Sequence, residues 1–180
     1  MKTLETERLI LRPWCEDDAD DMFQWAKSPN VGPRAGWPPH ENIEKSQSII
    51  KHFIAKDDVW AIVLKEAGKP IGSFGLHNDE KRNNPNARCL GYVLSEDYWG
   101  KDIIAEATKE VLRFAFEEQD LTLVSVCHYD FNEQSKRVIE KCGFTYEGTL
   151  RQAVKLSFAN KPYDELCYSM TRAEWEIIEK

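Results

Sequence analysis

Residues 90–112, LGYVLSEDYWGKDIIAEATKEVL, hold the strand-to-helix connection that decides the fold. The strand is expected at Arg88–Leu94, and a helical apolar pattern begins at Trp99 or Gly100. The next segment, Leu121–Tyr129, is largely apolar, which is typical of a strand buried on both faces. A right-handed crossover through the helix places these two strands parallel.

The remaining segments predict further strands and helices around this pair. The expected strands are Arg8–Arg12, Val59–Lys65, Pro70–His77, Thr145–Phe158 and Pro162–Thr171. The expected helices are Asp17–Ala26, Asn42–Ala55 and Asn132–Cys142, with a last helical turn at Glu174–Ile178. Asn30–Glu41 is rich in proline and glycine and is expected to be a loop. This order indicates an α/β protein (α+β by some schemes) with a helix-flanked mixed sheet.

The length and composition indicate one globular domain over residues 1–180. A core of this size buries roughly two-thirds of the unfolded surface. The chain is 42% hydrophobic and 31% charged, as in soluble proteins, and it has no apolar run long enough to span a membrane. Its charged N-terminus does not resemble an export signal, so we expect a cytoplasmic protein.

The charge and the cysteines exclude several classes of function. A net charge of −7 argues against nucleic-acid or anionic-membrane binding, which needs a basic face. The five cysteines are scattered without metal-ligand spacing, so we expect no metal site. They are interpreted as reduced thiols, mostly small core residues.

Two strand-to-helix connections carry candidate chemistry. The turn at Gly100 opens a helix, and backbone N–H groups at such a start bind anions such as a pyrophosphate, although an ordinary connection has the same pattern. In YDFNEQSKRVIEKCGFTYEG, Tyr129–Gly148, Asn132 and Ser135 lie at the start of a second helix. Asn132 is either a helix cap or a binding residue, and Ser135 is either a plain helix residue or a hydroxyl donor for a leaving thiolate.

Three segments together resemble the GNAT superfamily of N-acetyltransferases, in particular its RimJ and RimL-like branch. They are TERLILRP near the start, GYVLSEDYWGKDIIAEA in the middle, and NEQSKRVIEKCGFTYEG followed by Arg151. The resemblance implies a mostly antiparallel sheet of about seven strands, with one splayed parallel pair and about four flanking helices. It also implies that acetyl-CoA is the acyl donor.

The resemblance assigns cofactor-binding and catalytic residues by position. The pantetheine arm would lie along the first parallel strand, near Asn132, and the pyrophosphate would lie on the turn before the long helix. Ser135 would protonate the departing CoA thiolate. The cofactor-binding residues implied in this way are Tyr92, Val93, Leu94, Trp99, Gly100, Lys101, Asp102, Ile103, Ile104, Asn132 and Ser135.

The pyrophosphate turn departs from the family pattern Q/R-x-x-G-x-G/A. Asp102 and Ile104 stand where the family has small residues, so a carboxylate would lie beside two phosphates. This departure motivates a second reading of the chain, as a GNAT-like ligand-sensing or interaction module with weakened CoA binding.

The general base and the acceptor site are less specific. The glutamate that the branch carries beyond its E-G pair corresponds to Val154, and the candidate bases are Glu147, Glu96, His77 and Asp164, with Glu147 preferred. We expect Trp37, His77 and Tyr163 to bind the acceptor.

The sequence therefore predicts an acetyl-CoA-dependent N-acetyltransferase. It would transfer an acetyl group directly, in a ternary complex, to a protein N-terminus or a small-molecule amine. We expect a monomer or a homodimer.

Overall fold

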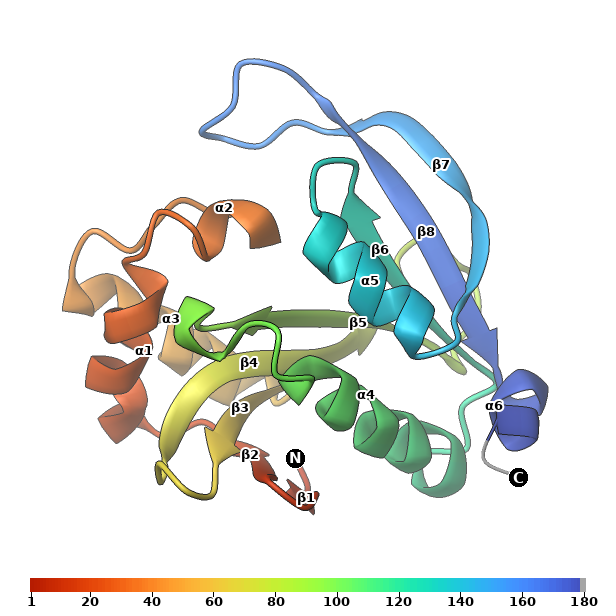
Figure 1. Cartoon of the computed structure of the whole chain (residues 1–180), viewed down its shortest axis with the longest axis horizontal. Coiled ribbons are helices and arrows are strands. Elements are labelled where there is room, and N and C mark those ends of the chain that lie inside the picture. Colours follow the sequence, from red (N-terminus) through yellow and green to blue (C-terminus); the bar gives the residue numbers. More distant parts are fainter. Residues whose placement is uncertain (179–180) are drawn as a thin grey trace. The chain divides into compact units, whose positions relative to one another are not determined.

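The eight strands belong to one mixed sheet, in the order β1-β2-β3-β4-β5-β6-β8-β7. This topology comes from a computed structural model, which describes residues 1–178. Figure 1 labels the strands and the helices α1 to α6. The sheet has one strand more than the sequence predicts, because the two-residue strand β1 (Leu4–Glu5) pairs with β2 (Leu9–Pro13).

Contacts divide the described chain into two compact units. Unit 1 comprises Met1–Gly75 and Tyr92–Ala107, and unit 2 comprises Leu76–Gly91 and the described residues from Thr108 onward. Strands β4 and β5 and helix α4 each contribute residues to both units.

Unit 1 contains the N-terminal strands and helices. Its elements are β1, β2, η1 (Glu16–Asp18), α1 (Ala19–Ala26), α2 (Gly32–Ala35), α3 (Ile43–Lys56), β3 (Val59–Leu64), the start of β4 (Lys69–Asn78), the end of β5 (Ala87–Leu94), η2 (Glu96–Tyr98) and the start of α4 (Ile103–Arg113). Helices α1 and α3 lie side by side, as Figure 1 shows. Their apolar faces and β3 form a buried cluster around Met22, Trp25 and Ile50, and Val93 and Trp99 pack against it. The apolar spacing that predicted these helices is therefore the spacing that builds this core.

Unit 2 contains the C-terminal half of the sheet. Its elements are the rest of β4, β5 and α4, then η3 (a π-helical segment, Phe114–Glu118), β6 (Leu123–Tyr129), α5 (Glu133–Lys141), β7 (Thr145–Val154), β8 (Tyr163–Thr171) and α6 (Arg172–Ile178). β6 and β8 are antiparallel, with residues from Leu123 to Tyr129 opposite residues from Thr171 back to Glu165.

The predicted parallel pair is confirmed. Residues Ala87–Leu90 of β5 lie opposite residues Leu123–Val126 of β6 in parallel register. Both strands continue beyond this ladder, β5 to Leu94 and β6 to Tyr129. The parallel pairing therefore covers only the first part of each strand.

Several predicted boundaries were wrong. The long helix begins at Ile103, not at Trp99 or Gly100, because Gly100 and Asp102 adopt the left-handed backbone conformation, with φ of 72° and 60°. The α-helix stops at Arg113, and the chain continues as the π-helical segment η3 to Glu118. The expected loop contains the short helix α2, where Pro33 fits the first turn. No helix within residues 1–178 combines the length and apolar character that crossing a lipid bilayer requires.

Candidate active site

The turn before α4, residues 99–104, has the backbone of an anion-binding turn. Gly100 and Asp102 are both left-handed, and the Asp102 carbonyl accepts the first helical hydrogen bond, from the Glu106 amide at 3.0 Å. A Cβ added at Gly100 would have no neighbour within 4 Å among the described residues. Such a turn, followed directly by a helix N-terminus, suits a pyrophosphate.

A side-chain clamp from the N-terminus holds this turn in unit 1. The Glu106 carboxylate accepts hydrogen bonds from Thr6 Oγ1 at 2.5 Å, from the Arg8 amide at 2.9 Å and from Arg8 Nε at 2.6 Å. A second Arg8 nitrogen donates to the Lys101 carbonyl oxygen at 3.0 Å. Although burial raises the pKa of Glu106, these donors hold it below the usual value. The clamp fixes one carbonyl of the turn and the first turn of α4.

Sequence reasoning missed the clamp. Thr6 and Arg8 belong to the TERLILRP segment and Glu106 to the GYVLSEDYWGKDIIAEA segment. Both segments carried the family resemblance, and their joint presence was the available signal. The spacing along the chain did not indicate that their polar residues meet.

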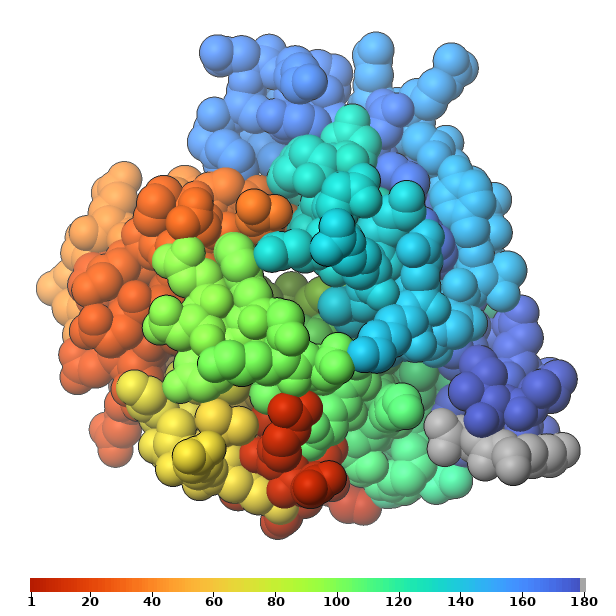
Figure 2. All heavy atoms as spheres, viewed as in Figure 1, coloured from red at the N-terminus to blue at the C-terminus, as the bar shows by residue number. Residues whose placement is uncertain are grey.

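Trp99 connects the turn to the end of β5. Its Nε1 donates to the Leu94 carbonyl oxygen at 2.9 Å, and the Arg34 guanidinium lies 5.3 Å from its ring centroid. Figure 2 shows the green atoms of the segment around residues 95–105 against orange atoms of the N-terminal helices. Trp99 therefore anchors the turn on the core of unit 1.

The other residues of the turn point in different directions. Lys101 Nζ donates to the Asp97 carbonyl at 2.9 Å and lies 5.1 Å from the Tyr98 ring centroid. Ile103 and Ile104 are buried. The bulk of Ile104 is thus accommodated in the core, whereas Asp102 is exposed. Asp102 is the departure from the family pattern that adds a charge at the surface of the turn.

The end of β5 lies unusually close to β4. A Cβ added at Gly72 would lie 2.3 Å from the Val93 carbonyl oxygen and 3.1 Å from the Leu94 Cα. The Ser95 amide donates to the Ile71 carbonyl at 2.8 Å, and the Tyr92 ring lies 5.7 Å from Phe74. Sequence reasoning did not single out Gly72, which allows this approach because it has no side chain.

In unit 2, Asn132 and Ser135 come together at the start of α5. The Asn132 side chain caps the helix by accepting a hydrogen bond from the Ser135 amide at 3.1 Å. Of the two roles that the sequence left open for Asn132, capping is the one observed. The cap fixes the first turn of α5, and with it the Cα of Ser135.

The preferred base, Glu147, is paired with two donors in unit 2. It forms an ion pair with Arg82 and accepts a hydrogen bond from Ser169 Oγ at 2.9 Å. The hydrogen bond from Arg82 keeps the pKa of Glu147 below its usual value, against the effect of burial. A carboxylate with a lowered pKa stays ionised but accepts a proton less readily.

The other candidate bases also have structural partners. Glu96 accepts hydrogen bonds from Ser28 Oγ at 2.7 Å and Asn30 Nδ2 at 2.8 Å, and both lower its pKa. Asp164 Oδ1 accepts from the Gln152 amide at 2.7 Å. Glu96 therefore holds the segment of Ser28 and Asn30, whereas Asp164 links β8 to β7.

The expected acceptor-binding residues lie in separate units. Trp37 is in unit 1, where it packs against the hydrophobic cluster and lies 5.0 Å from the His40 ring. Tyr163 and His77 are in unit 2. Tyr163 contacts the Phe131 ring edge-on at 4.8 Å.

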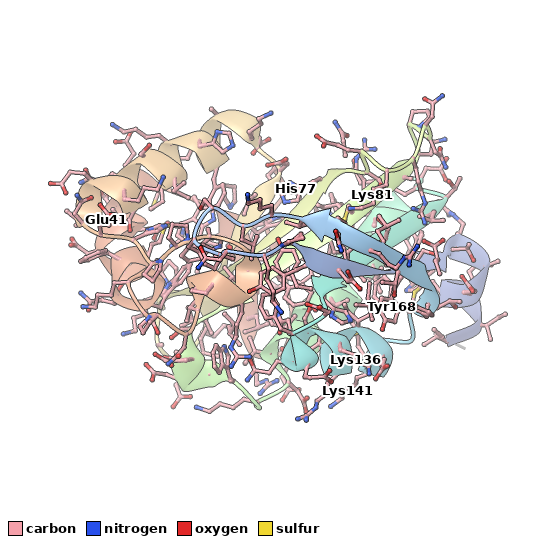
Figure 3. The ribbon with its side chains drawn as sticks, turned by 90° about the horizontal axis from the view of Figure 1, so that it is seen from above. Glu41, His77, Lys81, Lys136, Lys141 and Tyr168 are labelled. Atoms are coloured by element: carbon pink, nitrogen blue, oxygen red, sulfur yellow. The ribbon has the colours of Figure 1, made fainter. Side chains whose placement is uncertain are left out.

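His77 lies at the end of β4 (Figure 3). It is half-buried, and a Cβ added at Gly91 would lie 3.5 Å from its Nε2.

Comparison with known proteins identifies the family. The family model of the acetyltransferase (GNAT) domain matches residues 8–145. The chain is 29% identical over 174 residues to the uncharacterized N-acetyltransferase YoaA of Bacillus subtilis, covering 94% of this chain and 96% of YoaA.

Two solved structures share the fold. A GNAT-family acetyltransferase from Bacillus anthracis has a TM-score of 0.86 at 20% identity, over 96% of this chain and 100% of the other. The microcin C7 self-immunity acetyltransferase MccE, in complex with acetyl-CoA and AMP, has a TM-score of 0.81 at 21% identity, over 92% of this chain and 93% of the other. Since the family model covers most of the sequence and the same fold recurs in these structures, the chain belongs to the GNAT family of acetyl-CoA-dependent N-acetyltransferases.

Proposed function

We propose that this protein transfers an acetyl group from acetyl-CoA directly to a primary amine, in a ternary complex. The observation that carries the proposal is the turn of residues 99–104, which is left-handed at Gly100 and Asp102 and clamped by Arg8 and Glu106. A rigid turn at a helix start is the feature that an acyl-CoA enzyme needs to hold a diphosphate.

The residues of unit 1 would bind the donor. Backbone groups of Tyr92, Val93 and Leu94 would hold the pantetheine arm, because the ladder between β5 and β6 ends before them. Residues Trp99 to Ile104 would hold the diphosphate. Bound acetyl-CoA supplies the reactive thioester, and the chain's own groups orient it and manage protons.

Two residues of unit 2 would transfer protons during the reaction. Ser135, whose backbone is fixed by the Asn132 cap, is proposed to donate a proton to the CoA thiolate. Glu147 is proposed to remove a proton from the acceptor ammonium, directly or through water. Its Arg82 pair keeps it ionised at neutral pH, which suits a base, while its lowered pKa limits its strength.

The acceptor is proposed to be a protein N-terminal amine or a small-molecule amine, contacted by Trp37, His77 and Tyr163. MccE, which shares the fold, was solved in complex with a small molecule, AMP, as well as acetyl-CoA. We also propose that the protein is cytoplasmic, acts as one domain over residues 1–180, and needs no metal for this transfer.

A second function is favoured by one observation. Asp102 is exposed at the turn, where its carboxylate would repel a diphosphate. A ligand-sensing or interaction module that has lost turnover would tolerate this charge.

One paired experiment separates the two functions. CoA release would be followed with a thiol reagent over a panel of amines that includes N-terminal peptides, polyamines and aminonucleosides. The melting temperature would be measured with and without acetyl-CoA. Turnover with any amine removes the sensing function, and a folded protein whose melting temperature ignores acetyl-CoA removes the enzyme function.

A further inference from the structure

A cluster of thiols lies on one face of the strands in unit 2. Cys127 of β6 and Cys167 of β8 are directly opposite each other in the antiparallel register, and their Sγ atoms are 3.1 Å apart. Both residues are half-buried, so small molecules can reach them. The neighbouring residues His128 and Tyr168 are buried and stack on each other at 5.6 Å. Because side chains alternate along a strand, the two thiols point to the opposite face from this pair.

The backbone here fits a disulfide bond. Directly opposite residues of antiparallel strands have Cα atoms about 4.5 or 5.5 Å apart, depending on their place in the ladder. A disulfide spans Cα distances of about 4.4–6.8 Å. The two sulfurs are already in contact, so closing the bond requires side-chain rotation rather than movement of a strand.

A lysine places positive charge beside the thiols. Lys81 Nζ lies 3.2 Å from the Glu165 carboxylate and also acts electrostatically on Cys89 and Cys127. Figure 3 shows Lys81 on one side of the strands of unit 2 and Lys136 and Lys141 of α5 on the other.

Cys89 is the thiol of the cluster that ionises most readily. Hydrogen bonds from Cys127 and Ser125 lower the pKa of Cys89 to about 7, although burial opposes this. The pKa of Cys127 is raised by the same hydrogen bond. Cys127 is therefore the donor of this hydrogen bond and Cys89 is its acceptor.

We propose that Cys127 and Cys167 form an oxidative modification site that reacts with hydroperoxides to give a disulfide between β6 and β8. One of the two sulfurs attacks a peroxide oxygen and loses its proton. The O–O bond breaks, and the departing oxygen takes that proton and leaves as water or an alcohol. The other sulfur then attacks this sulfenic acid, the S–O bond breaks, and the hydroxyl leaves with the proton of the second thiol as water.

The reaction balances as a two-electron oxidation. Two thiols lose two electrons and two protons, and one hydroperoxide is reduced to water plus an alcohol, or to two waters. Cys89 is neither oxidised nor reduced in this reaction. This site is independent of the proposed acetyl transfer.

A metal ion is the competing occupant of the same cluster. Cys127, Cys167 and Glu165 offer three ligand atoms that all lie within 4.8 Å of one another. The Lys81 ammonium, however, already neutralises Glu165 and adds a positive charge beside the thiols. A divalent cation would have to displace it, so the charges favour oxidation over metal binding.

Peptide mapping of the full-length chain tests the proposal. The reduced protein is treated with stoichiometric hydrogen peroxide, alkylated, digested without reduction and analysed by mass spectrometry. We expect one linked peptide pair, Cys127 with Cys167, the loss of two hydrogens from the intact mass, and a melting temperature raised by several degrees.

Matched variants assign the roles. Cys167→Ser should abolish the linked pair, whereas Cys89→Ser should still give it. Lys81→Met should give the same pair several-fold more slowly. Cys15→Ser, which changes an exposed thiol in unit 1, should leave the pair unchanged. A dominant link through Cys89, or over-oxidation without any link, overturns the proposal. So does tight Zn²⁺ binding that is lost in Cys127→Ser and protects the thiols from peroxide.

Discussion

The Arg8 guanidinium lies 2.6 Å from the Glu106 carboxylate and also donates to the Lys101 carbonyl at 3.0 Å. One side chain of the N-terminal segment therefore holds both the first turn of α4 and the turn before it. The N-terminal TERLILRP segment therefore stabilises the turn of residues 99–104 and the start of α4, almost a hundred residues further along the chain.

Glu106→Gln tests this clamp. The charge is lost while the shape is kept, so we expect a loss of about 1–2 kcal/mol in the free energy of unfolding and a several-fold higher KM for acetyl-CoA, with a smaller change in kcat. Urea unfolding and initial rates measure both. Glu117→Gln is the control, because it breaks the exposed pair with Arg113 away from the turn and should leave KM unaltered.

The pair of Arg8 and Glu106 should also make the free energy of unfolding depend on pH. The pKa of Glu106 is lowered in the folded protein, so its contribution to stability is fully present above the unfolded value of 4.5 and is lost as the pH falls through the lower folded value. Unfolding free energies of the wild type and Glu106→Gln should therefore converge in acid. Curves that stay parallel from pH 7 to pH 3 would show that the carboxylate charge has no such role.

Substitutions of Asp102 distinguish the effect of its charge from the effect of its backbone conformation. Asp102→Gly removes a charge and suits the φ of 60°, while Asp102→Asn removes the charge and still tolerates that φ. At about 5 Å and an effective dielectric constant of about 20, each like-charge contact costs roughly 3 kcal/mol before screening. Both variants should bind acetyl-CoA several-fold more tightly in calorimetry, and Asp102→Ala should bind well but fold less stably. If all three variants bind acetyl-CoA with unchanged affinity, the charge of Asp102 does not weaken binding.

Gly72→Ala tests the close approach of β4 to β5. The new Cβ would lie 2.3 Å from the Val93 carbonyl oxygen, so one of the two backbones must move. We expect a loss of about 1–3 kcal/mol and a strong fall in kcat/KM. Gly91→Ala is the matched control, since its Cβ meets only His77 at 3.5 Å. Equal effects in the two variants would argue against a special role of Gly72.

Ser135→Ala tests protonation of the leaving thiolate. We expect kcat to fall with little change in the affinity for acetyl-CoA, because only the hydroxyl is removed and the capped Ser135 amide remains. Asn132→Ala is the comparison, because it removes the cap and should cost about 1 kcal/mol in stability. An undiminished kcat in Ser135→Ala excludes the proposed role.

The ion pair between Glu147 and Arg82 should set the pH at which kcat/KM falls in acid. Arg82 keeps the pKa of Glu147 below 4.5, so as a base Glu147 should stay active to lower pH than an ordinary glutamate. Arg82→Met should move the acid limb of kcat/KM to higher pH, and Glu147→Gln should lower kcat/KM throughout. A Glu147→Gln enzyme with normal kcat/KM would place the base elsewhere.

Local patterns predicted most of the fold. Apolar alternation located β3 and β5 within one residue of their observed starts, and helical spacing located α3, because core burial and side-chain periodicity coincide there. The start of α4 was misplaced because Asp102 adopts a conformation that sequence patterns assign mainly to glycine. Helix α2 was missed because its four residues are too few for a periodic signal.

The polar contacts of the candidate site were beyond local patterns. Asn132 is a cap within its own helix, so its neighbourhood in the sequence predicted it. The Arg8–Glu106 clamp and the Cys127–Cys167 contact join residues 98 and 40 positions apart and depend on strand order. The cysteines had been interpreted as mostly core residues, and this was wrong, since among the five only Cys142 is buried.

The division of unit 1 into two chain segments has a consequence for synthesis on the ribosome. Its second segment, Tyr92–Ala107, supplies Val93 and Trp99 to the core cluster and Glu106 to the clamp. The first 75 residues therefore leave the exit tunnel with an open core and an unpaired Arg8. Chaperones that shield nascent apolar surface should remain bound until residue 107 has emerged.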